Sequence, residues 1–152
     1  MIYNIWKLLH VLSAIIFVGN ITIGIFWKMQ ADKSKDRLKI AETFKNIIKA
    51  DKIFTMPSVT ALILFGIGTA MQGNYSLIDT SWIFWSIIMI IISAYVFMSK
   101  IVPIQKKIYA LASNPEKFSW DDYSVLSKKW NLWGSIATVT PYIAVILMVI
   151  KP

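Results

Sequence analysis

Residues 2–27 read IYNIWKLLHVLSAIIFVGNITIGIFW and contain one lysine, one histidine and no acidic side chain. A helix needs about 20 mostly apolar residues to cross the roughly 30 Å hydrocarbon core of a bilayer, so this stretch is long enough to span a membrane. Three further apolar stretches follow, at residues 53–71, 82–98 and 130–150. The chain is therefore predicted to be an integral membrane protein.

The composition supports this interpretation, because 57% of the 152 residues are hydrophobic, more than a soluble domain of this size can bury. The predicted fold class is all-α, an antiparallel bundle of four transmembrane helices in a single domain. Its spans are expected at about residues 3–29, 55–72, 81–102 and 129–151. The first apolar stretch has no small-x-small cleavage site and runs into a lysine-rich segment, so we expect it to be retained.

Basic residues are concentrated in two connecting segments. Eight lie between residues 28 and 52 and six between residues 100 and 129, whereas residues 53–99 have none. The positive-inside rule then places both basic segments in the cytoplasm and both termini outside a bacterial-type plasma (inner) membrane. The net charge of +8 is thereby explained through topology and anionic lipid, without nucleic acid as a partner.

The first basic segment, Asp32 to Lys52, has the periodicity of an amphipathic helix, with apolar residues at steps of three and four. We expect this cytoplasmic helix to lie on the inner leaflet or to pack beneath the bundle. It should end near Lys52, and the second span should begin near Thr55, an N-cap before Pro57.

Three features of the last two spans predict local geometry. Pro103 is expected to kink or end the third span. The sequence Ser119-Trp120-Asp121-Asp122 resembles a capping box and predicts a helix start there, ahead of the fourth span. Pro141 is expected to kink that span, with Thr138 and Thr140 satisfying the freed backbone groups.

His10 is the only histidine and the one clear ionisable residue inside a predicted span, which makes it a functional hypothesis. At 1.5 Å per residue it lies roughly 12 Å from the outer end of its helix, and Met89 and Tyr142 lie at similar depths. Histidine and methionine form a known axial pair for haem iron. The sequence thus predicts a haem b site with His10 as metal ligand, Met89 and Tyr142 nearby, and Lys7 able to reach a propionate.

Other roles for these residues stay open. His10 and Met89 could bind Cu(I), His10 could transfer protons, or it could only form an interhelical hydrogen bond to Tyr142 or Thr138. In that last case the protein would be a cofactor-free structural or accessory subunit, with Gly66 and Ala70 as a small-residue contact between helices.

Two further polar residues have mainly structural expectations. Asn20 is expected to form hydrogen bonds between helices. Asp51 lies between Lys49 and Lys52, so an ion pair with one of them, or a helix-terminal role, is expected.

An autonomous enzyme is not favoured by the sequence. There are no cysteines, no paired carboxylates inside the spans, no Glu-x-x-His motif, no phosphate-binding glycine loop and no serine nucleophile elbow. Hydrolysis and phosphoryl transfer therefore lack their usual groups.

Several short motifs together carry a family resemblance. They are Lys7-Leu8-Leu9-His10 followed by Gly19 and Trp27, Asp51 followed by Pro57 and Gly66, Val102-Pro103-Ile104-Gln105, and Trp130, Trp133-Gly134 and Pro141 before the C-terminal Met148-Val149-Ile150-Lys151-Pro152. Over nearly the whole chain this resembles a bacterial family of four-helix integral membrane proteins of unknown function, related to copper-resistance D-like and HemJ-like proteins.

The resemblance implies haem b held by a helix-1 histidine, which matches His10. The HemJ-like relation further implies protoporphyrinogen oxidation with a lysine on a later helix, for which Lys100 is the nearest candidate. The expected partners are the lipid bilayer and a second copy or a larger membrane complex, since two copies of His10 could meet across a twofold axis.

Overall fold

The computed structural model describes all 152 residues, and its regular structure is entirely helical. Its segments are α1 (Ile2–Ser34), α2 (Arg37–Ala50), η1 (Asp51–Thr55), α3 (Met56–Gln72), α4 (Ser81–Val96), η2 (Phe97–Ile101), α5 (Val102–Ser113) and α6 (Trp120–Ile150). Segments α2, η1 and α3 join end to end, as do α4, η2 and α5, so the chain forms four long helical rods. All four are long and apolar enough to cross a membrane, which confirms the all-α class and the four spans.

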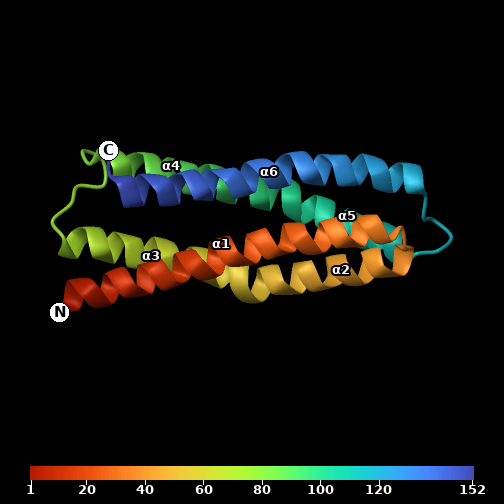
Figure 1. Ribbon diagram of the computed structural model, residues 1–152, viewed down its shortest axis with the longest axis horizontal. Coiled ribbons are helices and arrows are strands. Elements are labelled where there is room, and N and C mark those ends of the chain that lie inside the picture. The colour runs from red at the N-terminus through yellow and green to blue at the C-terminus, as the bar shows by residue number, and fades with distance from the viewer.

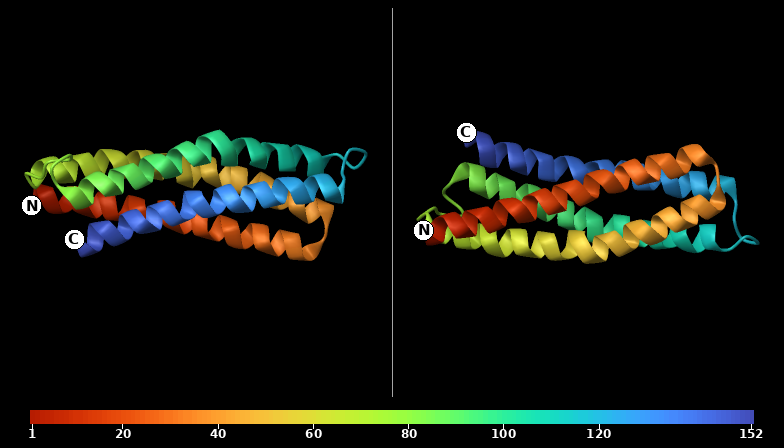
Figure 2. Two further views of the ribbon diagram at one scale, coloured as in Figure 1. Left: turned by 90° about the horizontal axis from the view of Figure 1, so that it is seen from above. Right: turned by 60° about the horizontal axis from the view of Figure 1, so that its bottom comes forward.

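The rods lie alongside one another, and successive rods run in alternating directions (Figure 1). Both chain termini and the connection at residues 73–80 lie at one end of the molecule, and the connections at residues 35–36 and 114–119 lie at the other. The views in Figure 2 agree with this arrangement. We call the part near the termini the terminal half and the part near the other two connections the basic half.

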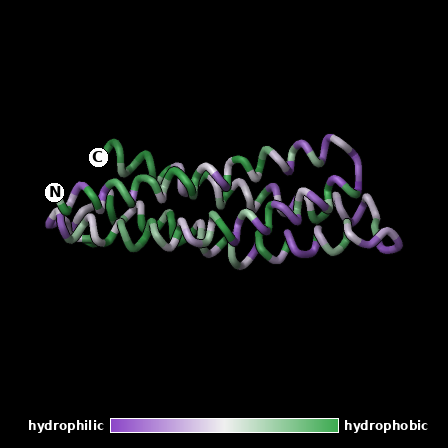
Figure 3. The backbone as a smooth tube through the Cα atoms, turned by 90° about the horizontal axis from the view of Figure 1, so that it is seen from below, coloured by the Kyte–Doolittle hydropathy of each residue, from purple (hydrophilic) through white to green (hydrophobic).

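The two halves differ in polarity, and they pack differently. Apolar residues dominate the terminal half and hydrophilic ones gather in the basic half (Figure 3). The basic half has a conventional core, in which Ile40 and Phe44 of α2 meet Ile104 and Ile108 of α5 and Tyr123 of α6. The buried residues of α2 thus pack on α5, and α2 continues the rod of α3 instead of lying beneath the spans.

Helices of the terminal half associate mainly in pairs. There α1 packs on α3 and α4 packs on α6, whereas α3 contacts neither α4 nor α6. Large apolar side chains such as Leu12, Ile63 and Ile91 point outward. This is the arrangement expected where lipid is the solvent, because lipid tails do not drive apolar side chains into a core.

The expected helix boundary near Thr55 is absent. Thr55 has helical backbone angles and no capping bond, and η1 is a π-helical turn that leads directly into α3. A second π-helical turn, η2, occupies the same position before Pro103. In each case the N–H just before the proline bonds five residues back, Met56 to Asp51 and Val102 to Phe97. A proline ring clashes with the carbonyl four residues earlier, and a wider turn relieves that clash without ending the helix.

Pro141 is accommodated in a different way, by a neighbouring helix. It cannot donate to the carbonyl of Ala137, and the hydroxyl of Ser93 on α4 donates to that oxygen instead, at 2.7 Å. Seven residues earlier, the Ser86 hydroxyl donates to the Trp82 carbonyl of its own helix at 2.7 Å and shares that proton with the Ala144 carbonyl at 3.3 Å. The prediction that Thr138 and Thr140 would satisfy the freed group was wrong for this carbonyl, because the donor comes from another span.

The Ser93 bond yields a double-mutant prediction. Ser93→Ala should destabilise the protein by about 1 kcal/mol, since it leaves a carbonyl in apolar surroundings without a donor. In a Pro141→Ala background the restored N–H should supply the donor, and Ser93→Ala should then cost little. Both effects are measured as free energies of unfolding by denaturing-detergent titration in mixed micelles.

Ser99→Ala is the matched control, because the Ser99 hydroxyl bonds only the Tyr95 carbonyl of its own rod. Equal costs for Ser93→Ala in both backgrounds would contradict the assignment.

Candidate functional site

His10 lies at the contact between α1 and α3. Its Nδ1 is 2.9 Å from the carbonyl oxygen of Leu62. Because a carbonyl only accepts, the proton is on Nδ1, and in the neutral ring Nε2 keeps its lone pair. The ring packs against Gly66, where an added Cβ would lie 2.9 Å from His10 Cε1, so the glycine leaves room for the imidazole. The histidine therefore forms the expected interhelical bond, but with a backbone acceptor.

The structure places the other predicted site residues separately. The Tyr142 hydroxyl lies 2.9 Å from the Thr22 hydroxyl, one of the two donating, and so pairs with α1 at a different position from His10. Met89 is on α4, which makes no direct contact with α1. Lys7 is exposed one turn before His10. Among the four, His10 and Tyr142 form hydrogen bonds to other residues, and they do so at separate places.

No protein-built metal centre accompanies His10. The chain gathers no group of three His, Cys, Asp or Glu side chains that could hold an ion. His10 can thus supply one ligand to a metal whose remaining ligands come from elsewhere, as from a macrocycle.

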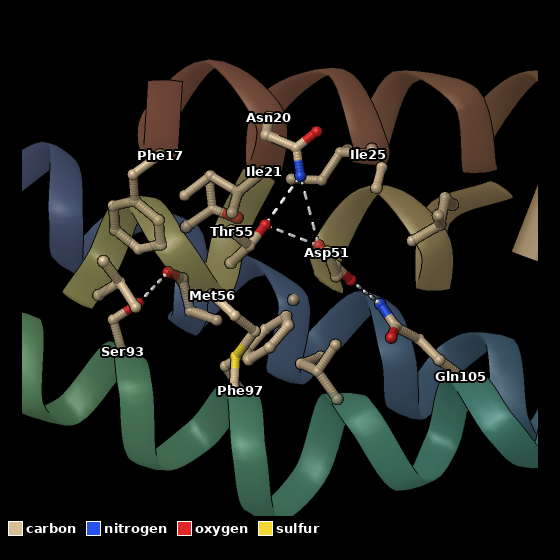
Figure 4. Close-up of a pocket in the computed structure, with 18 of the residues that line it drawn as sticks. Phe17, Asn20, Ile21, Ile25, Asp51, Thr55, Met56, Ser93, Phe97 and Gln105 are labelled. Atoms are coloured by element: carbon tan, nitrogen blue, oxygen red, sulfur yellow. Dashed lines mark hydrogen bonds between the residues drawn. The ribbon is translucent and has the colours of Figure 1, made fainter. Parts of the chain in front are cut away.

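A cavity of about 200 Å³ lies where the two halves meet (Figure 4). Apolar side chains form most of its wall, among them Phe17, Ile21 and Ile25 of α1 and Phe97 of η2. Both π-helical turns contribute lining residues. Such turns occur often at functional sites, because they turn side chains and carbonyls away from their ordinary helical directions.

One side of this cavity holds a polar group that we call the Asp51 cluster: Asn20, Asp51, Thr55 and Gln105. Asp51 accepts hydrogen bonds from the Thr55 hydroxyl at 2.8 Å, the Asn20 amide at 3.4 Å and the Gln105 amide at 3.0 Å. The Asn20 amide also donates to the Thr55 hydroxyl at 2.8 Å. Figure 4 shows these side chains converging from three rods.

The cluster corrects one expectation and confirms another. Asp51 is 8% exposed and pairs with neither Lys49 nor Lys52, since the one salt bridge in the chain joins Lys28 and Asp32. Asn20 does form interhelical hydrogen bonds, as expected. Gln105 was named only within a family motif and not as a partner of Asp51, because a glutamine in a basic segment usually faces water.

A second buried group, the Lys28 cluster, links α1 to α6. Lys28 is 1% exposed, and its ammonium donates to Asp32, Ser127 and Asn131 at 2.5, 2.6 and 2.7 Å. The hydroxyl of Tyr123, in the first turn of α6 and ahead of its apolar stretch, donates to Asp32. Burial, and then the Asp32 carboxylate, raise the pKa of the Tyr123 phenol, which keeps it a donor.

The distribution of basic residues marks Lys28 only as a topology signal. Asp32, one helical turn later, was the available sign of a paired lysine. Trp130 packs beside the cluster, with Lys28 Nζ 5.6 Å from its ring centroid, and also lines the cavity. Its indole N–H is the one buried side-chain polar atom without a hydrogen-bond partner.

These groups can bind and position a ligand. The cavity joins an apolar volume to hydrogen-bonding side chains. The arrangement is typical of small-molecule sites, which are mostly apolar with a few convergent polar groups.

Comparison with known proteins gives one match. The model of a family described as predicted integral membrane protein (DUF2269) matches residues 4–152. No curated protein and no solved structure matches the chain.

The Asp51 cluster should contribute measurably to stability. Asp51→Ala removes the acceptor of three hydrogen bonds and should cost about 2 kcal/mol, at about 0.6 kcal/mol for each hydrogen bond in a membrane protein. Denaturing-detergent titration in mixed micelles measures the change. Glu42→Ala is the control, because it removes the same charge from an exposed position on α2. Indistinguishable unfolding free energies for the two variants would show that the cluster adds nothing.

Proposed function

The chain belongs to this family of predicted integral membrane proteins, and we propose that it is a small, non-catalytic four-helix membrane protein that binds haem b through His10. The observation that carries the proposal is the hydrogen bond between His10 Nδ1 and the Leu62 carbonyl. Histidines that ligate a metal nearly always donate their other ring N–H in this way, which fixes the tautomer and orients the ring. The bond leaves Nε2 as the ligand atom.

The surroundings of His10 suit a flat apolar group. Trp6, one turn earlier on α1, packs edge-on against Phe65 of α3 with ring centroids 5.7 Å apart. Lys7 is exposed on the next residue and supplies a cation for a propionate. Haem iron bound here would supply a one-electron redox centre. Met89 as a second axial ligand, and a homodimer or larger complex, stay predictions.

The proposed setting is the plasma membrane of a bacterial-type cell. We place the terminal half in the bilayer with both termini outside, and the basic half in the cytoplasm. The support is the distribution of charge, since the fourteen basic residues of the two long segments belong to the half with the conventional core. A water-exposed half needs such a core, and a lipid-exposed half does not.

Haem binding is tested with His10→Asn. The asparagine Nδ2 stands as many bonds from the backbone as the histidine Nδ1, so it can still donate to Leu62, but it offers no atom in place of Nε2. The wild type, expressed with ample haem, should show a Soret band, and His10→Asn should lose it while unfolding at the same detergent concentration.

Ser13→Ala is the control, because the Ser13 hydroxyl bonds only the Leu9 carbonyl within α1, so this variant should keep the band. A colourless wild type would refute the proposal and favour the alternative of a cofactor-free accessory subunit. The HemJ-type oxidase alternative predicts that the protein consumes protoporphyrinogen, and our proposal predicts that it does not. Its candidate lysine, Lys100, lies over the Trp133 ring at 5.4 Å.

Topology is tested by cysteine labelling, for which a chain without native cysteine is well suited. Asn74→Cys, in the connection of the terminal half, should react with a membrane-impermeant maleimide in intact cells. Glu116→Cys, at the opposite end, should react only after the membrane is opened. The reverse pattern would overturn the proposed orientation.

A further inference from the structure

The central cavity contains one carboxyl group and no basic side chain. Asp51 is its only charged lining residue, and no lysine, arginine or histidine lines it. The one buried cation in the chain, Lys28, gives its hydrogen bonds to Asp32, Ser127 and Asn131. Burying an unpaired carboxylate is costly, so a cation in the cavity would be attracted strongly.

We propose that this cavity binds a small organic cation, an ammonium group on an apolar body, with the ammonium on Asp51. The inference is independent of haem binding at His10, because His10 does not line the cavity. A carboxylate offers about four acceptor sites, and three are taken by Thr55, Asn20 and Gln105. The remaining site accepts from the ligand.

The walls fit the apolar part of such a ligand. Phe17, Phe97 and Trp130 line the cavity, and aromatic faces attract ammonium ions. An apolar cavity of about 150 Å³ is known to hold benzene, so a cavity of about 200 Å³ accommodates one ring with a short aminoalkyl arm.

The cavity also has an entrance. Met56 and Met98 line it and are exposed on the outer surface of the bundle, at 39% and 51%. They lie next to η1 and within η2, so a ligand can enter laterally between the two π-helical turns. Methionine side chains are flexible enough to move aside.

The test compares two probes of nearly equal shape, protonated 2-phenylethylamine and neutral 2-phenylethanol. Binding to the purified full chain in non-ionic detergent is followed by calorimetry, with empty micelles subtracted. The amine should bind saturably, and the alcohol should bind weaker by roughly tenfold or more, since a desolvated charge pair contributes to the first alone. Equal affinities, or no saturable amine binding, would overturn the proposal.

Variants locate the site. Asp51→Asn keeps an acceptor oxygen but removes the charge, and it should weaken amine binding by roughly tenfold or more. Glu42→Gln makes the same charge change on exposed α2 and should leave it unaltered, as should His10→Asn. Gly24→Leu fills the cavity from a glycine whose Cβ direction is empty, and it should abolish binding without touching Asp51. Undiminished binding in Gly24→Leu would refute the location even if Asp51→Asn failed to fold.

Discussion

Backbone groups inside hydrocarbon must find their hydrogen-bond partners within the protein, and three prolines put that requirement at risk here. At Pro57 and Pro103 the helix widens into π-helical turns that bond five residues back. At Pro141 the Ser93 hydroxyl of the neighbouring span donates to the Ala137 carbonyl, which has lost its helical N–H partner. Both π-helical turns contribute to the wall of the central cavity, and the Ser93 hydrogen bond joins α4 to α6.

In the setting that we propose, the basic half lies in water and the terminal half lies in lipid. Water drives Ile40, Phe44 and Ile108 into a shared core in the basic half. In the terminal half that force is missing, and small residues and hydroxyl-to-carbonyl bonds hold helices together in pairs. The Asp51 and Lys28 clusters lie near the boundary between the two halves. Their polar side chains form hydrogen bonds between rods across the bundle.

Sequence reasoning succeeded where a pattern is local. Apolar runs long enough to span a bilayer identified the four rods, and the motif at Ser119 correctly marked the start of α6, where the Ser119 hydroxyl accepts from the Asp122 N–H. It failed where the outcome depends on a partner distant in sequence. Pro57 was interpreted as the start of a new helix, because no sequence composition distinguishes a π-helical turn that carries a helix past a proline. Asp51 was expected to form an ion pair because two lysines flank it, whereas its hydrogen-bond partners include Asn20 and Gln105, 31 and 54 residues away.

The hydrogen bonds that meet at Asp51 have a mechanical consequence. Helices with uniformly apolar surfaces can slide past one another in a bilayer at little cost in free energy, because one leucine contact resembles the next. Asn20, Asp51 and Gln105 belong to three different rods, and their bonds close only at one relative height and rotation. A slip of a single residue, about 1.5 Å along the axis, would separate the partners. These three side chains therefore fix the relative height and rotation of the rods, which the apolar lipid-facing surfaces do not determine.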